Sequence, residues 1–160
     1  MKQFELPYFG KVDVENITEE QEYLNVKFQE RELILMWFAE LEIEEGYLQN
    51  AKNILADLDK FNENCLNHIQ QEFVNSQDKT ILEFLEYHLE ELPTELSKII
   101  GVSTLESEKI ERLLNALKLK NISFHDYDIV ADYVIDEEVS DQILAIGINN
   151  NGEKNIAWES

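Results

Sequence analysis

The stretch Arg31–Glu45, which reads RELILMWFAELEIEE, decides the fold that we expect for this chain. Every second residue of it is apolar, so these residues would lie on one face of a β-strand. They are Leu33, Leu35, Trp37, Ala39, Leu41 and Ile43. The other face is apolar up to Phe38 and acidic beyond it, as in a strand that is covered on both faces only at its start. An i, i+4, i+8 spacing of apolar residues also allows a helix.

A second alternating run, Tyr23–Phe28, precedes this stretch and favours the strand interpretation. Gln29-Glu30 lies between the two runs and would form a two-residue hairpin turn, although it lacks the usual glycine. Upstream, Phe4–Phe9 contains a proline and is predicted to be an edge or interrupted strand. Lys11–Glu15 alternates as well. The first third of the chain is therefore predicted to be a meander of strands.

The hydrophobic period changes after Gly46. Apolar residues then step by three and four, which predicts amphipathic helices. These runs extend from Leu48 to Leu58, from Phe61 to Phe73, from Ile81 to Leu92 and from Ile110 to Leu117. Asp78 is a candidate N-cap, and Pro93 should end the third helix. Ser103 and Glu106 have the spacing of a capping box before the last helix.

The last third returns to period two. Ile129, Ala131, Tyr133 and Ile135 alternate with a second set of residues that includes Asp128 and Asp132, whereas Gln142–Ile148 is apolar on both faces and is predicted to be an interior strand. Asn151-Gly152 is the strongest hairpin signal in the chain, and Lys154–Trp158 would be the returning strand. The order strands, helices, strands predicts an α+β fold, with a central block of helices packed on a mostly antiparallel sheet. We expect one domain over residues 1–160.

Net charge is the extreme property of the composition. The chain has 34 Asp and Glu against 13 Lys and Arg, a net charge of −21. Binding of nucleic acid or an anionic membrane is disfavoured, because both need basic side chains. A basic protein or a cation would be attracted, although acidic charge also simply keeps a protein in solution. Cys65 is the only cysteine, and no signal peptide or long apolar run is present, so a cytoplasmic location is predicted.

Cys65, His68 and Glu72 come nearest to a metal site, because spacings of three and four place them on one helix face. Cys65 also belongs to an apolar stripe, where a thiol acts as a small hydrophobic residue. We favour this second interpretation and predict no metal and no cofactor. Structural roles are also predicted for the other histidines: His88 at the border of a helix, and His125 near the beginning of a strand.

The candidate partner-binding residues are acidic. They are Glu40, Glu42, Glu44, Asp136, Glu137 and Glu138. Convergence of such runs on one face would steer a basic partner toward it. Exposed tyrosine or tryptophan beside that face would strengthen this interpretation, because aromatic side chains anchor interfaces.

Three segments carry a resemblance to a known family: FELPYFGKVDVEN at 4–16, EYHLEEL at Glu86–Leu92, and DYVIDEEVSDQILAIGINNNGEKNIAWES at 132–160. Together they resemble a small bacterial domain family without an assigned function. The resemblance spans nearly the whole chain and implies a bacterial, cytoplasmic α+β domain. It implies no catalytic or binding residues.

The function that we expect is that of a non-enzymatic, acidic domain that binds a basic protein. An immunity protein that neutralises a toxic nuclease is the concrete version. One alternative is a metal-dependent hydrolase that uses the acidic residues with His68, His88 or His125. The other is a structural or oligomeric domain whose acidity serves solubility.

Overall fold

The structure is a computed structural model that describes residues 3–13, 23–39, 44–75 and 78–160. Strands come first, helices follow, and strands end the chain, as the sequence predicts. The elements are β1 Gln3–Leu6, β2 Gly10–Asp13, β3 Tyr23–Phe28, β4 Arg31–Trp37, α1 Glu45–Ala56, α2 Leu58–Asn75, α3 Thr80–Glu91, α4 Ser97–Ile100, α5 Glu106–Asn115, β5 Lys118–Phe124, β6 Asp128–Val134, β7 Ile143–Asn149 and β8 Lys154–Glu159.

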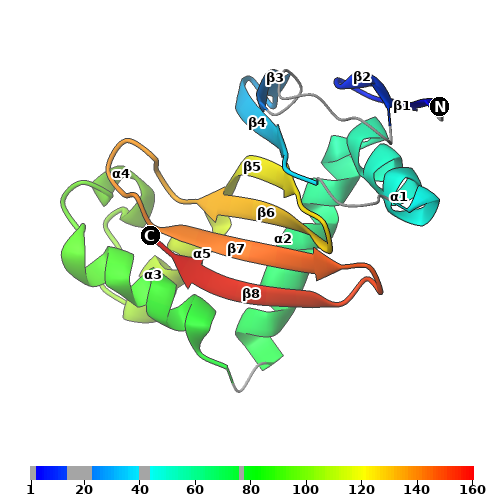
Figure 1. The fold of residues 1–160 in the computed structure, drawn as a ribbon. Coiled ribbons are helices and arrows are strands. Elements are labelled where there is room, and N and C mark those ends of the chain that lie inside the picture. The colour runs from blue at the N-terminus through cyan, green and yellow to red at the C-terminus, as the bar shows by residue number, and fades with distance from the viewer. Residues whose placement is uncertain (1–2, 14–22, 40–43, 76–77) are drawn as a thin grey trace.

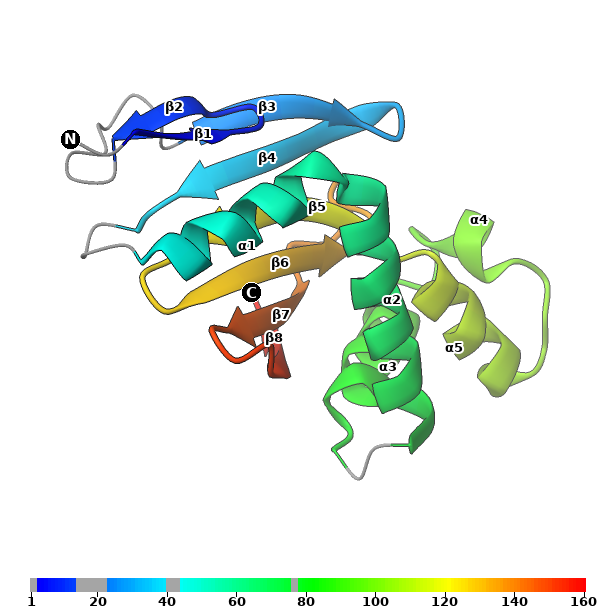
Figure 2. The same ribbon diagram turned by 90° about the vertical axis from the view of Figure 1, so that its right-hand side faces the viewer.

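The main sheet has six strands in the order β3-β4-β5-β6-β7-β8. All neighbours are antiparallel except β4 and β5, which run parallel. Helices α2 to α5 lie together on one side of this sheet (Figures 1 and 2), and α1 runs along strands β4 to β6 on the same side as α2 (Figure 2). The prediction of an α+β fold with helices packed on a mostly antiparallel sheet is confirmed.

The core lies between the sheet and the helices. Leu33, Leu35 and Trp37 of β4 are buried there, as the period-two pattern predicts. The Trp37 ring stacks on Phe124 at 5.2 Å between centroids, and Phe9 packs edge-on against both rings. Burial of each such side chain contributes roughly 1.5–3 kcal/mol. This aromatic cluster fixes α1 through Tyr47, whose ring meets Trp37 edge-on.

Strand β5 was not among the predicted strands, although it is central to the sheet. Its pairing with β6 shifts by one residue between Leu119 and Asn121, which is a β-bulge. The core-facing residues are therefore Leu119, Ile122 and Phe124, at spacings of three and two. Because the bulge breaks the alternation, the sequence of β5 does not show a strand period.

The N-terminal third departs from a single meander. Strands β1 and β2 form a separate two-stranded sheet, whose β1 contacts α1. The expected strand Phe4–Phe9 ends at Leu6, because a turn that contains Pro7 follows. Strand β4 ends at Trp37 rather than continuing to residue 43 as predicted, and Glu45 begins α1. The predicted positions 40–43 lie outside the described residues.

The hairpin turn between β3 and β4 is where the sequence predicts it. Gln29 and Glu30 have φ angles of 50° and 66°, so both central residues are left-handed. This is the conformation of a two-residue type I′ turn, which usually selects Asn-Gly. The register of the hairpin, with Phe28 opposite Arg31, confirms the predicted pairing.

Helix ends differ from the predictions in detail. The break between the first two helices falls at Asp57, and the last helix ends at Asn115, before Leu117. The capping box is not formed, since Ser103 Oγ accepts the Leu105 N–H at 3.3 Å and donates to Glu108. Asp78 lies one residue before the N-cap of α3 and accepts the Thr80 N–H at 3.0 Å.

Candidate functional site

One face of the six-stranded sheet carries no helix among the described elements, and we call it the open face. Two rows of paired residues cross it from β3 to β8. The first row is Asn25, Ile34, Asn121, Asp132, Ala145 and Ala157, and the second is Tyr23, Met36, Ser123, Val130, Gly147 and Asn155. The face thus combines small and apolar residues with a few polar side chains near its centre.

The β-bulge places Asn121 on this face. Leu119 and Ile122 flank the bulge and are both fully buried under the helices. In a regular strand, Asn121 would point to the same side as Leu119. The extra residue of the bulge turns both Lys120 and Asn121 toward the open face, beside Asp132 of β6.

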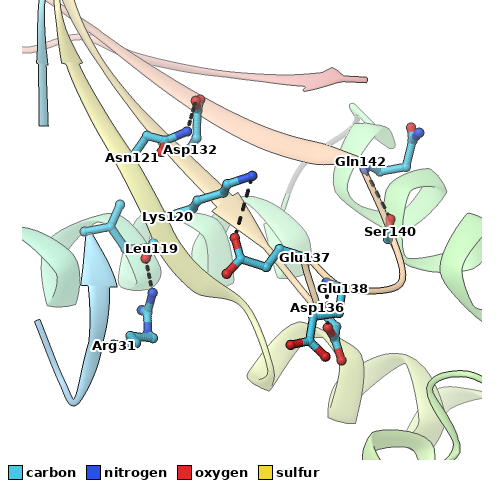
Figure 3. Close-up of polar contacts among 10 residues, drawn as sticks. All are labelled: Arg31, Leu119, Lys120, Asn121, Asp132, Asp136, Glu137, Glu138, Ser140 and Gln142. Atoms are coloured by element: carbon cyan, nitrogen blue, oxygen red, sulfur yellow. Dashed lines mark hydrogen bonds and ion pairs between the residues drawn. The ribbon is translucent and has the colours of Figure 1, made fainter. Parts of the chain in front are cut away.

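Asn121 and Asp132 form the central polar contact of the open face (Figure 3). The Asn121 Nδ2 group donates a hydrogen bond to Asp132 Oδ2 at 3.2 Å, and Asn121 is only 9% exposed. The other two oxygens, Asn121 Oδ1 and Asp132 Oδ1, are buried and have no hydrogen-bond partner among the described residues. Unpartnered buried acceptors are costly, so a native structure that contains them needs a reason for them.

Charge on Asp132 is disfavoured by its surroundings. Burial raises the pKa of this carboxyl, and the nearby Glu159 carboxylate acts in the same direction. The hydrogen bond from Asn121 and the charges of Lys120 and His125 oppose the rise in pKa. The net shift is upward, so Asp132 is a carboxyl group whose ionised form gains from an added cation.

Aromatic residues occupy one corner of the open face, where β5 ends. His125 stacks on Phe38 with 5.5 Å between ring centroids, and Tyr23 meets Phe38 edge-on at 5.8 Å. His125 Nε2 lies 2.9 Å from Ser123 Oγ, and Tyr23 is 62% exposed. The aromatic rings extend the open face to edge strand β3.

The predicted acidic residues Asp136–Glu138 lie in the β6–β7 loop and border a groove of about 270 Å³. The opposite wall is basic: Arg31 donates a hydrogen bond to the Leu119 carbonyl, and Lys120 Nζ lies 3.7 Å from Glu137 Oε2 (Figure 3). Burial lowers the pKa of Arg31, although the Glu137 charge opposes the shift. This groove has walls of both signs and is not a purely negative surface.

The acidic runs do not all gather at one place. Glu40 and Glu42 lie outside the described residues, and Glu44 is exposed just before α1. Helix α1 and the β6–β7 loop lie toward opposite ends of the sheet (Figure 1). Glu90 and Glu91, in contrast, end the helix that contacts this loop through His88. The negative charge is therefore spread around the molecule.

His88 is fully buried, which corrects the expectation of a residue at the helix border. Its Nδ1 atom lies 2.8 Å from the Phe84 carbonyl oxygen, and its Nε2 atom lies 2.8 Å from Ser140 Oγ. Burial lowers its pKa, against a smaller opposing effect of the bond to Phe84. A neutral ring can donate from Nδ1 and accept the serine hydroxyl at Nε2, so His88 ties α3 to the β6–β7 loop.

Cys65 faces the core, next to the Tyr133 hydroxyl, which donates to Asn62 Oδ1 at 2.7 Å. Burial raises the pKa of the Cys65 thiol to about 11, so the thiol stays protonated at neutral pH. His68 and Glu72 are half-buried on the same helix. Within the described residues, no three His, Cys, Asp or Glu side chains are arranged to hold a metal ion.

The histidines of the hydrolase alternative lie apart. His125 precedes β6 and His88 contacts the loop that follows it, so the seven-residue strand separates them by roughly 20 Å. His68 belongs to α2.

For the oligomer alternative, edge strands β3 and β8 carry Lys27, Lys154 and Glu159, charges of the kind that discourage edge pairing.

Exposed aromatic residues do occur at the surface. Tyr8, Tyr23 and Tyr127 are 52%, 62% and 70% exposed, whereas Tyr47 is buried and Trp158 packs against Phe84 and Tyr87 of α3.

Sequence reasoning missed Asn121 and Ser123 as residues of the open face, because strand β5 was not predicted. The triplet Leu119, Ile122 and Phe124 was the available signal for a bulged strand.

Comparison with known proteins gives no further identification. No family model matches the chain, and no curated protein or solved structure matches it. The resemblance to a bacterial domain family therefore stays a prediction.

Among the helices in the described ranges, none has both the length and the apolar character needed to cross a membrane.

Proposed function

We propose that this protein is a non-enzymatic domain that binds a basic protein through the open face of its sheet. The observation that carries the proposal is the uncovered face with the buried Asp132 carboxyl and two unpartnered acceptor oxygens near its centre. Acceptors without donors favour a partner that brings donors, and lysine and arginine are the side chains that only donate.

The charge balance supports a basic partner. The chain carries 34 Asp and Glu but only 13 Lys and Arg, a net charge of −21. Most carboxylates therefore have no basic side chain within the protein to neutralise them. Such a field raises the rate of encounter with a positively charged protein, and it does so most strongly at low salt.

The shape of the surface supports a macromolecular partner. Ligand pockets for small molecules usually have volumes of about 300–1,000 Å³ and enclose the ligand. The groove beside the open face has about 270 Å³, and its walls are charged side chains. The open face instead provides a broad contact surface, with the exposed Tyr23 at one edge. Aromatic side chains commonly anchor protein interfaces.

An immunity-type protein that blocks a basic toxin is the concrete form of this proposal. A blocking protein needs a rigid, charge-complementary surface and no catalytic residues of its own. The open face stands on a six-stranded sheet backed by helices, which supplies the rigidity.

The test is affinity capture from a lysate of the source organism, with a charge-matched unrelated acidic protein as the control bait. We expect one basic protein to bind at near-stoichiometric amount at low salt, to elute at high salt and to be absent from the control. Purified with the chain, it should form a complex of defined stoichiometry. Co-expression should suppress any toxicity of that protein. Equal capture by both baits would contradict the proposal.

A further inference from the structure

We infer that Asn121 and Asp132 form a binding site for an arginine side chain of the partner. This inference rests on the proposed binding of a basic protein and adds the chemistry of recognition at one site. It begins from a juxtaposition: two acceptor oxygens, one from an amide and one from a carboxyl, lie on neighbouring strands without donors.

A guanidinium group matches this pair of acceptors. It is planar and presents several N–H donors in a fixed fork, so it can bond two oxygens at once. Asn121 Nδ2 already holds Asp132 Oδ2 at 3.2 Å, which fixes both side chains and leaves the other oxygen of each unbonded. An arginine would then donate to Asn121 Oδ1 and Asp132 Oδ1 without breaking the existing hydrogen bond.

The surroundings favour arginine over lysine. The neighbours of the pair in its own row are Ile34 and Ala145, which offer no acceptors from their side chains. A cation that enters this region loses water, and guanidinium is more weakly hydrated than ammonium. The rings of Tyr23, Phe38 and His125 lie on the same face, and arginine stacks on such rings more readily than lysine does.

Access requires side chains to move, since both free oxygens are shielded from solvent in the unbound protein. Lys120 and Glu159 are the long neighbours whose charges act on Asp132, and Lys120 also reaches Glu137. Interface side chains commonly change rotamer on binding while the backbone stays in place. An incoming arginine would then contact Asp132 directly, whereas Lys120 pairs with Glu137 in the unbound protein.

The test uses the full chain, labelled with ¹⁵N, and N-acetyl-arginine amide as the probe. We expect chemical-shift changes centred on the amides of residues 121 and 132, with at least tenfold weaker binding of N-acetyl-lysine amide. The variant Asp132→Asn keeps the size of the side chain and should lose the site-specific changes. Glu63→Gln is the matched control, because it removes one exposed carboxylate from α2, on the helix side of the sheet.

Three outcomes would overturn the inference: no localised shifts, equal shifts with both amides, or unchanged shifts in the Asp132→Asn variant. The partner captured from the lysate separates this inference from the proposed function. If that partner binds the wild type and Asp132→Asn equally, the arginine site is wrong and the protein-binding function stands. Localised arginine binding without any captured basic partner would support the site and overturn the proposed function.

Discussion

The Nε2 atom of His88 lies 2.8 Å from the Oγ atom of Ser140, and this contact joins the interior of α3 to the β6–β7 loop. Ser140 Oγ also accepts the N–H of Gln142 at 3.2 Å, and the Gln142 side chain accepts the Trp158 indole N–H at 2.7 Å. The imidazole of His88 thus joins α3 to the loop, and Gln142 joins the loop to strand β8.

This buried imidazole should make stability depend on pH. The folded-state pKa of His88 is lowered by burial, whereas the unfolded value is about 6.5. Below that pH the unfolded state binds the extra proton first. The free energy of unfolding should therefore hold above about pH 6.5 and fall below it, by up to about 1.4 kcal/mol per pH unit. Urea unfolding at pH 7.5, 6.5 and 5.5 measures the effect.

His88→Gln is the comparison for that experiment, because glutamine fills much of the same space and does not titrate. All other ionisable groups remain in the variant, so the difference between the two pH profiles belongs to His88. Parallel profiles from pH 7.5 to 5.5 would show that His88 does not drive the pH dependence.

The hydrogen bond from Tyr133 to Asn62 should contribute to stability. The two groups meet at 2.7 Å in the core, and Asn62 is 6% exposed. Tyr133→Phe leaves the amide oxygen buried without its donor, which should cost about 1–3 kcal/mol in the free energy of unfolding. Tyr127→Phe, at a tyrosine that is 70% exposed, should change it by less than about 0.5 kcal/mol. Equal effects of the two variants would contradict the assignment.

The β3–β4 turn should be improvable by mutation. Glu30 has a φ of 66° at the second central position, where glycine fits best. Glu30→Gly removes this strain but adds flexibility to the unfolded chain, so we expect a net gain of about 0.5–1 kcal/mol. Gly152→Ala is the reciprocal change. Gly152 has a φ of 79°, and no atom lies within 4 Å of the position that a Cβ would take, so the strained backbone alone should destabilise the variant. Thermal unfolding of both variants provides the test.

These cases show which parts of the fold the sequence could reveal. The hairpin of β3 and β4 and the pairing of β7 with β8 follow from alternating residues and turn chemistry, which are local. Strand β5 follows from neither, because its bulge interrupts the alternation and its partner β4 lies far away in sequence. The parallel pairing of β4 and β5 needs the whole helical block as a connection, and no local pattern specifies it.

The candidate site was less predictable for the same reason. Asn121 reaches the open face only through the bulge, and Asp132 was visible in the sequence as one acid among 34. The acidic runs were conspicuous as runs, but the position of a charge along the chain does not fix which face it joins. His88 shows the converse: its polar side chain is buried because Phe84 and Ser140 supply both of its hydrogen bonds.

Cys65 should be inert toward thiol reagents in the folded protein. It is fully buried, and its thiol pKa of about 11 leaves little thiolate at pH 8. We expect negligible labelling by Ellman's reagent in buffer and rapid labelling in 8 M urea. One equivalent of Zn²⁺ should leave both the labelling and the Tm unchanged. Fast labelling in buffer, or a rise in Tm with Zn²⁺, would restore Cys65, His68 and Glu72 as a metal site.

The Asp132 carboxyl should lower stability at neutral pH. Its folded-state pKa is raised above the unfolded value of about 3.9, so the folded state holds its proton to higher pH. The free energy of unfolding contributed by this group is therefore greatest below about pH 4 and is lost as pH rises through the folded pKa. In the variant Asp132→Asn the side chain at this position cannot ionise, so the variant should be more stable than the wild type between pH 4 and 7.

Urea unfolding across this pH range measures the gain in stability, with Glu63→Gln as the exposed control. A variant less stable than the wild type at pH 7 would mean that the charge stabilises the fold and that Asp132 needs no partner to explain it.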